Sequence, residues 1–208
     1  MALGTASATA PYEMRFDAGR ICLDLLSTAH PVERLDSLAA LGTWITGSGL
    51  VPPGTPLTRA DASWLTGFRE LRSHVRRLVR RAVTGPAESD GNRAGNRPYD
   101  IALARVNDIA RVAPPAPRAV QQRDGTLVRE LDGSPECHAL LAVIARDAVD
   151  LLTDPVARAC IRQCEGEACP IVYVDTSRGR RRRWCSSEVC GNRERVARHR
   201  RRAALARA

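Results

Sequence analysis

The hydrophobic positions along most of the chain follow the pattern of amphipathic helices. Apolar residues recur at steps of three and four, the spacing that aligns side chains on one face of a helix. The longest such run predicts a helix over roughly Arg59–Val83 with Thr58 as its N-cap, and Asp36 is the predicted N-cap of a shorter helix through Ile45. Further helices are predicted over Ala18–Thr28, over Pro98–Val112, and from Ser134-Pro135 to about Leu152, where proline suits the first helical position.

Turn residues interrupt these helices and indicate one β-hairpin. Asp124-Gly125 lies between the runs Ala119–Gln122 and Thr126–Leu131, and an Asp-Gly pair between two such runs is typical of a hairpin. Residues 1–14 are predicted to form a flexible tail. Gly85–Arg97, rich in Gly, Pro and Asn, is predicted to be a loop. The pattern thus favours a mainly α fold.

Charge is distributed unevenly along the chain. All 32 basic residues are arginines. Residues 1–157 carry 18 arginines and 18 acidic residues, whereas residues 158–208 carry 14 arginines and five acidic residues, so the net charge of +9 lies entirely in the last quarter. Such asymmetry is expected when one segment contacts a polyanion. We therefore predict a helical domain over 15–157, containing the hairpin, and a small basic module over 158–208, with Asp154-Pro155 at the junction.

The sequence also bears on localisation. No run of 18 apolar residues is present, so no spanning helix and no membrane partner are predicted. Met1–Pro11 lacks the basic start and apolar run of a secretory signal. We therefore expect a cytoplasmic protein, in which clustered cysteines favour a metal site over disulfides.

Four of the seven cysteines form two close pairs within the basic module. Two C-x4-C pairs separated by fifteen residues can converge on one tetrahedral ion, for which zinc is the usual metal: Cys164, Cys169, Cys185 and Cys190. Four thiolates leave no open position for water, so one structural Zn²⁺ is expected. Cys160 is an alternative to Cys164, although the symmetric spacing favours Cys164. Cys22 and Cys137 lie on apolar helices and are predicted to be core residues.

The segment around these cysteines predicts a compact zinc module. Ile171–Val174 is expected to be a strand, Asp175–Gly179 a turn, and Arg181–Trp184 a returning strand. Cys185 then approaches a helix with Ser186 or Ser187 as its N-cap, and Cys190 falls in the first turn of that helix. A knuckle, a β-hairpin and a helix around one zinc resemble a treble-clef or zinc-ribbon arrangement.

The same residues are similar to a known family. The run R-x-C-x4-C-x3-Y-x-D-x-S-x5-R-W-C-S-x3-C-G-N-R, from Arg162 to Arg193, resembles the CGNR zinc finger. Upstream, GRICLDLLST (Gly19–Thr28), LAALGTWITGSGL (Leu38–Leu50) and the arginine-rich helix resemble the ABATE domain, its usual companion. The resemblance implies a stress-induced bacterial transcription regulator. Ser27-Thr28 departs from the Asn-Thr that the family commonly carries at this point.

Arginines gather in two clusters beside the predicted metal site, one on the hairpin and one on the C-terminal helix. Arginine binds phosphate bidentately and reads guanine, so the helix could lie in the major groove while the hairpin holds the DNA backbone. The candidate DNA-binding residues are Arg178, Arg180, Arg181, Arg182, Arg183, Asn192, Arg193, Arg195, Arg198, His199 and Arg202.

Helical spacing places Asn192, Arg195, His199 and Arg202 on one face of this helix, and Val189, Val196 and Ala203 on an inward stripe. Simpler interpretations remain open: a solvated basic helix end, an Asn192 that braces the zinc loop, and a Gly191 that relieves crowding beside the metal. Trp184 is expected to form the core of the module.

The helical domain contains fewer candidate functional residues. Arg20 and Asp24, four residues apart, form either a local ion pair or, together with Trp44, part of a pocket for a small molecule. Trp44, Trp64 and Phe68 are predicted to be core residues. The four histidines are scattered, no Ser/His/Asp arrangement is recognisable, and no phosphate-binding loop occurs. The sequence therefore predicts that the protein is not an enzyme.

These observations favour a zinc-containing DNA-binding regulator with double-stranded DNA as its partner. The helical domain would sense a signal, such as a small-molecule effector, or form a homodimer that lengthens the DNA site. The alternative is a zinc-stabilised module that binds an acidic protein or RNA. A redox switch through oxidation of zinc thiolates is compatible with the first hypothesis.

Overall fold

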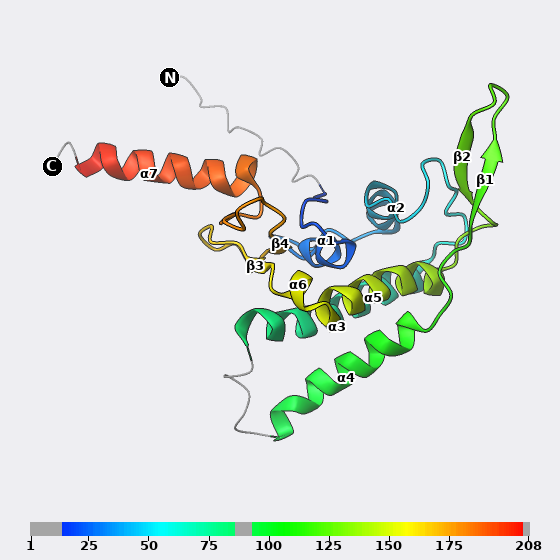
Figure 1. Cartoon of the computed structure of the whole chain (residues 1–208), viewed down its shortest axis with the longest axis horizontal. Helices are drawn as coiled ribbons and strands as arrows, with labels where there is room; N and C mark the ends of the chain where they lie inside the picture. The colour runs from blue at the N-terminus through cyan, green and yellow to red at the C-terminus, as the bar shows by residue number, and fades with distance from the viewer. Residues whose placement is uncertain (1–13, 86–92, 206–208) are drawn as a thin grey trace, which may run out of the picture.

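The computed structural model describes residues 14–85 and 93–205 and shows a mainly helical protein (Figure 1). Helices α3 (Ala62–Thr84), α4 (Arg93–Ala110) and α5 (Cys137–Thr153) pack against one another. Helix α1 (Ile21–Ser27) contacts α3 and α5, and α2 (Leu38–Gly47) contacts α3. The expected fold class, mainly α with a C-terminal cysteine module, is confirmed.

The centre of the helical bundle is built from the apolar positions that the spacing indicates. Trp44 is fully buried, and its ring meets Phe68 edge to face, with centroids 5.9 Å apart and an interplanar angle of 75°. Trp64 is also buried, which confirms these three aromatic residues as core. Cys22 is buried on α1 and Cys137 is half-buried on α5, as expected of core cysteines.

The predicted hairpin is present. Strand β1 (Pro117–Gln121) pairs antiparallel with β2 (Leu127–Leu131), with Ala119 opposite Arg129. Asp124 Oδ1 accepts the Thr126 amide at 3.0 Å, and Gly125 takes a positive φ of 86°, which suits glycine. The hairpin projects from the helical body at the end opposite the zinc module (Figure 1).

Two predicted N-caps are wrong by one to three residues. Helix α2 begins after Ser37, not Asp36, because Ser37 Oγ accepts the amide of Ala40 at 3.2 Å. Helix α3 begins after Asp61, not Thr58, because Asp61 Oδ1 accepts the amide of Ser63 at 2.9 Å. In each case the helix starts where a side-chain oxygen reaches a free amide of the first turn.

Two other helix starts also differ from the prediction. Helix α5 begins at Cys137 with Glu136 as its N-cap, so Pro135 lies before the helix rather than at its first position. Helix α4 begins at Arg93 and includes Pro98, five residues into the helix, so the predicted loop extends too far. The rest of that loop, 86–92, lies outside the described residues, as does the predicted tail up to residue 13.

The basic module is fastened to the helical bundle through the short segment Arg15–Gly19. The Ala18 amide donates to Asp24 Oδ1 on α1 at 3.0 Å, and the Ala18 carbonyl accepts the amide of Val174 in the module at 2.8 Å. Arg20 forms its ion pair with Asp147 on α5, at 2.7 Å, rather than with Asp24. The predicted local ion pair is therefore wrong, because the Asp24 carboxyl turns toward a backbone amide instead.

No helix in the described part of the chain is both long and apolar enough to cross a membrane.

The buried carboxyl of Asp24 should make the stability of the protein depend on pH. Desolvation raises its pKa from 3.8 to about 7, so the folded state favours the protonated form. The stability that this group contributes is complete below about pH 4 and is lost as the pH rises through about 7, at a cost on the order of 1–3 kcal/mol. We expect Asp24→Asn to remove this loss.

The test is urea unfolding of the wild type and of Asp24→Asn at about pH 5.5 and about pH 8. The variant should gain stability relative to the wild type at the higher pH. Asp36→Asn, at an exposed position, is the matched control and should show no such gain. Equal pH dependence in Asp24→Asn and the wild type would contradict the assignment.

Candidate metal centre

The first cysteine pair lies in the loop of a short hairpin. Strand β3 (Ile161–Gln163) pairs antiparallel with β4 (Val172–Val174), and the connection between them carries Cys164 and Cys169. The Cys164 amide donates to the Ile171 carbonyl at 2.9 Å, which closes the base of this loop. The hairpin therefore surrounds the knuckle, whereas the sequence placed it between the two cysteine pairs.

Arg181–Trp184 is not the returning strand that the sequence predicted, because β3 pairs with one edge of β4 and the Val174 amide on the other edge donates to the Ala18 carbonyl. Individual hydrogen bonds hold the segment in place instead. Asp175 Oδ2 accepts the amide of Arg182 at 2.9 Å, and the Arg183 carbonyl accepts the amide of Glu165 at 2.9 Å. This path returns the chain to the knuckle with Cys185 beside Cys164.

The second cysteine pair lies where the C-terminal helix begins. Of the two predicted N-caps, Ser186 is the one that caps the helix: its Oγ accepts the amides of Glu188 and Val189, both at 3.2 Å. A π-helical turn, Ser187–Gly191, follows and continues into α7 (Asn192–Leu205). This wide turn carries Cys190 toward the knuckle.

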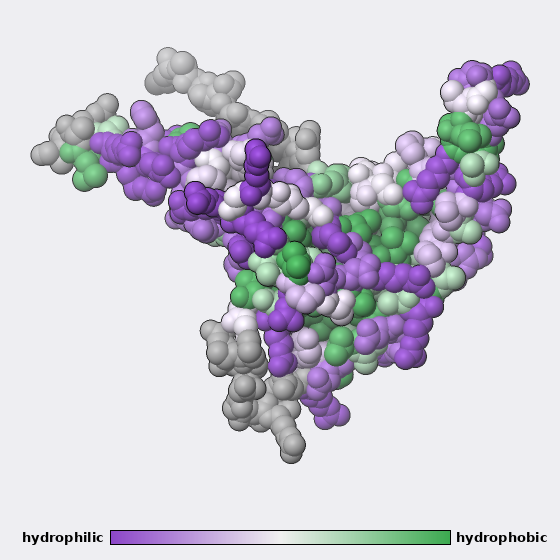
Figure 2. Space-filling model, in the orientation of Figure 1, coloured by the Kyte–Doolittle hydropathy of each residue, from purple (hydrophilic) through white to green (hydrophobic). Residues whose placement is uncertain are grey.

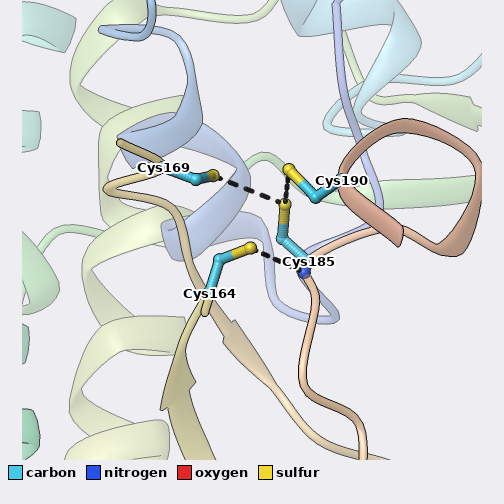
Figure 3. Close-up of side chains that lie close together, drawn as sticks. All are labelled: Cys164, Cys169, Cys185 and Cys190. Atoms are coloured by element: carbon cyan, nitrogen blue, oxygen red, sulfur yellow. Dashed lines mark hydrogen bonds between the residues drawn. The ribbon is translucent and has the colours of Figure 1, made fainter. Parts of the chain in front are cut away.

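The four sulfur atoms converge on one point (Figure 3). They lie within 4.8 Å of one another; Cys185 Sγ is 3.8 Å from that of Cys169 and 3.6 Å from that of Cys190. Zn–S bonds of about 2.3 Å in a tetrahedron place sulfurs about 3.8 Å apart, so the spacing fits zinc. Cys160 is buried but lies outside the group, so the structure brings Cys164, and not Cys160, together with the other three cysteines.

Backbone amides favour negatively charged sulfur at Cys164, whereas the neighbouring thiol and burial oppose it at Cys185 unless a metal is bound. The amides of Gly166 and Cys185 donate to Cys164 Sγ at 3.4 and 3.3 Å. Without a metal, the hydrogen bond with Cys169 and burial raise the pKa of the Cys185 thiol to about 12. A bound dication is therefore what allows four thiolates to lie together, and bound zinc would act as a structural Lewis acid that joins the knuckle to the helix.

Two arginines compensate the net negative charge of the zinc–thiolate group. Four thiolates around Zn²⁺ leave a net charge of −2. Arg15 Nη1 donates to Cys185 Sγ and Arg193 Nη2 to Cys190 Sγ, each at 3.3 Å, so two guanidinium groups offset it. Sequence reasoning missed Arg15 because it lies 170 positions from Cys185 and no local motif links them.

A glycine makes room for the sulfurs, although it is not the one the sequence indicated. A Cβ at Gly166 would lie 3.3 Å from the Cβ of Cys190 and 3.4 Å from the sulfurs of Cys164 and Cys190. At Gly191 an added Cβ would meet only ordinary contacts, at 3.5 Å or more, from Trp184 and a backbone oxygen. Gly166 is thus the residue that relieves crowding beside the metal.

Helix α7 has no buried residue and projects away from the helical body (Figure 1). Val189 and Val196 are 48% and 42% exposed, so the predicted inward stripe is wrong. The reason is that α7 leaves the module along its own axis, so that among the described elements it packs mainly against the π-helical turn before it. Hydrophilic side chains cover most of the face of α7 seen in Figure 2.

The structure divides the candidate DNA-binding residues into two groups. In the first group, the guanidinium donates to a partner within the chain, and this group has four members: Arg182, Arg183, Arg193 and Arg195. Arg182 lies over the ring of Tyr173 at 4.5 Å and donates to the carbonyls of Trp184 and Cys185, so it holds the return segment together. Arg183 pairs with Glu165 at 2.5 Å.

The other seven are exposed, and their side chains have no hydrogen-bond or ion-pair partner among the described residues: Arg178, Arg180, Arg181, Asn192, Arg198, His199 and Arg202. Asn192 therefore does not brace the zinc loop through its side chain. In the helical domain, the residues considered for a pocket are engaged: Arg20 with Asp147, Asp24 with Ala18, and Trp44 with Phe68.

Comparison with protein families agrees with this architecture. A family model described as "ABATE: Putative stress-induced transcription regulator" matches residues 19–155, about two thirds of the chain. The chain belongs to the ABATE family. The model of the CGNR zinc finger matches residues 161–203, which include all four cysteines. No curated protein matches the sequence.

The ABATE protein is thus a zinc-finger member of a regulator family, and its four cysteines are positioned to bind a single zinc ion. Both matching families are regulatory or zinc-finger types rather than enzymes.

Substitution of a ligand should abolish zinc binding. We expect Cys185→Ser to lower the zinc content from about one ion per chain to about zero, because its sulfur lies within 3.8 Å of the sulfurs of Cys169 and Cys190. Native mass spectrometry gives the stoichiometry directly. Cys160→Ala is the matched control, a buried cysteine outside the cluster, and should retain the ion. Retained zinc in Cys185→Ser would overturn the ligand set.

Removal of the remote guanidinium should weaken zinc binding without abolishing it. Groups that hydrogen-bond to metal ligands typically contribute about 10–100-fold to metal affinity. We expect Arg15→Gln to weaken zinc affinity by about tenfold, as measured by competition with a chromophoric chelator. Arg59→Gln removes an equal charge from an exposed ion pair with Glu136 and should leave the affinity unchanged. Equal affinities in the two variants would show that Arg15 does not stabilise the metal centre.

Proposed function

We propose that the protein is a cytoplasmic DNA-binding transcription regulator whose zinc module, residues 158–208, contacts double-stranded DNA. The main support is the set of seven unpartnered polar and basic side chains on the exposed surface of a module that carries 14 arginines against five acidic residues. Free guanidinium groups at one end of the molecule, held by a rigid metal centre, suit a polyanionic partner.

The two free clusters differ in the DNA contacts that they suit. Arg198, His199 and Arg202 lie on α7, which has no packed face and can enter a major groove about 12 Å wide. Arg178, Arg180 and Arg181 lie at the turn after β4, where they suit phosphate contacts that fix the register of the helix. The four arginines with internal partners support the metal module and contribute little direct contact.

The helical domain, residues 15–157, then has a sensory or dimerising role. One small module covers few base pairs, so two copies of the chain would give a longer site with two-fold symmetry. The domain contacts the zinc module directly, through Arg15 and Ala18, so a change in one can reach the other.

Sequence selection on genomic DNA tests the proposal. Zinc-loaded protein is incubated with sheared genomic DNA at about 150 mM salt, and the recovered fragments are sequenced. A shared motif is the expected result, and a palindrome within it would indicate a dimer. Uniform recovery would limit the arginines to backbone contacts. No recovery would overturn the proposal in favour of an RNA or acidic protein partner.

A pair of charge-matched variants locates the DNA surface. We expect Arg198→Gln/Arg202→Gln to weaken binding to the selected site and to lower the slope of log K against log salt by about 2, if both residues contact phosphates. A larger loss on the selected site than on random DNA would indicate base readout. Arg123→Gln/Arg129→Gln, exposed in the β1–β2 hairpin, removes the same charge and should leave the slope unchanged. Fluorescence anisotropy provides the affinities.

A further inference from the structure

A cavity of about 370 Å³ lies at the junction between the helical domain and the zinc module. Its walls come from α1 and the turn after it, from the C-terminal half of α3, and from the β3–β4 hairpin. The volume falls within the range of about 300–1,000 Å³ in which small-molecule sites occur. The sequence suggested Arg20, Asp24 and Trp44 as pocket residues, and none of these three lines this cavity.

The polar side of the cavity is positively charged. Arg76 and Arg80 both line it, no acidic residue does, and neither guanidinium has a hydrogen-bond or ion-pair partner within the described residues. The arginine one turn earlier on α3 differs: Arg72 is buried, pairs with Glu33, and donates to Thr28 Oγ1 at 2.7 Å. Arg76 and Arg80 therefore bring two unpaired guanidinium groups to the cavity, whereas the charge of Arg72 is already paired.

This arrangement is unfavourable in the empty protein. Arg76 and Arg80 are four residues apart, and like charges at that spacing repel on a helix surface. His30, also in the lining, supplies no anionic group to offset them, and burial and the nearby Arg76 and Arg72 lower the pKa of its ring. An anion between the two guanidinium groups would relieve the repulsion and accept their hydrogen bonds.

The opposite side of the cavity is apolar. Leu26, Val79 and Ile171 are buried core residues that reach its surface, and half of the twelve lining residues are apolar. A simple inorganic ion would leave these side chains without contacts. A molecule with both a carboxylate and a hydrocarbon part would satisfy both sides.

We propose that this cavity binds a small organic carboxylate, with its anionic group between Arg76 and Arg80 and its apolar part against Leu26, Val79 and Ile171. The molecule would also touch Gln163 and Pro170, the residues that directly adjoin Cys164 and Cys169. It would therefore bridge the helical domain and the hairpin that carries the first zinc-ligand pair. The proposal goes beyond DNA binding and does not depend on it.

Octanoate is the probe, with 1-octanol as its uncharged counterpart. Isothermal titration calorimetry on the zinc-loaded, DNA-free full-length chain should show one octanoate site per chain and weaker binding of octanol. Arg76→Gln and Arg80→Gln should each weaken octanoate binding by about tenfold or more, because a charge-assisted hydrogen bond is lost. Arg77→Gln is the matched control: it is exposed on the same helix but does not line the cavity, and its affinity should equal that of the wild type.

A second variant separates the cavity from the protein surface. Val83→Phe places a larger side chain in the lining and should weaken octanoate and octanol alike, while the circular dichroism spectrum and zinc content stay unchanged. The proposal is overturned if octanoate fails to bind, if octanol binds equally well, if Arg77→Gln weakens binding as much as Arg76→Gln, or if Val83→Phe retains full affinity. DNA affinity of Arg80→Gln, measured without octanoate, is a separate readout of the DNA proposal, so the two can fail independently.

Discussion

Four sulfur atoms held within 4.8 Å of one another are the constraint on which the C-terminal module depends. Thiolates this close repel unless a dication lies between them, so the fold of the module and its metal are coupled. The same point joins three segments that are distant in the sequence: the knuckle, the start of α7, and Arg15 from the N-terminal segment. A module with few apolar residues obtains its rigidity from this centre rather than from a core of its own.

The charge left on the metal centre also explains how the two parts of the chain are joined. Arg15 reaches Cys185, and Ala18, three residues later, links Asp24 on α1 to Val174 on β4. The short segment between Arg15 and Gly19 therefore serves both the helical bundle and the zinc module. The cavity at their junction follows from the same arrangement, since α3 and the β3–β4 hairpin meet there without filling the space between them.

The arginines of the module act in two ways. Arg182, Arg183, Arg193 and Arg195 use their guanidinium groups on carbonyls, a carboxylate and a sulfur inside the module. Arg162 likewise donates to the carbonyls of Ala159 and Ile161. Among the described residues, Arg178, Arg180 and Arg181 stay free after β4, as do Arg198 and Arg202 on α7. This division matters because a guanidinium that is already bound within the module attracts DNA only weakly. A free guanidinium gives up only solvent when it contacts a phosphate, and the contact releases counterions from the DNA.

The sequence determined the local features of this protein. Helical periodicity, the Asp-Gly turn, the two C-x4-C pairs and the placement of charge depend on residues close together in the chain, and each is recovered in the structure. The tertiary structure alone decided which strand pairs with β4, that Arg20 pairs with Asp147, that Arg15 supports Cys185, and that Val189 and Val196 remain exposed. Each of these outcomes depends on contacts between segments that are distant in the sequence, such as a strand beside a strand edge, or an arginine beside a carboxylate or a sulfur. The spacing of residues within one segment carries no information about which distant segment packs against it.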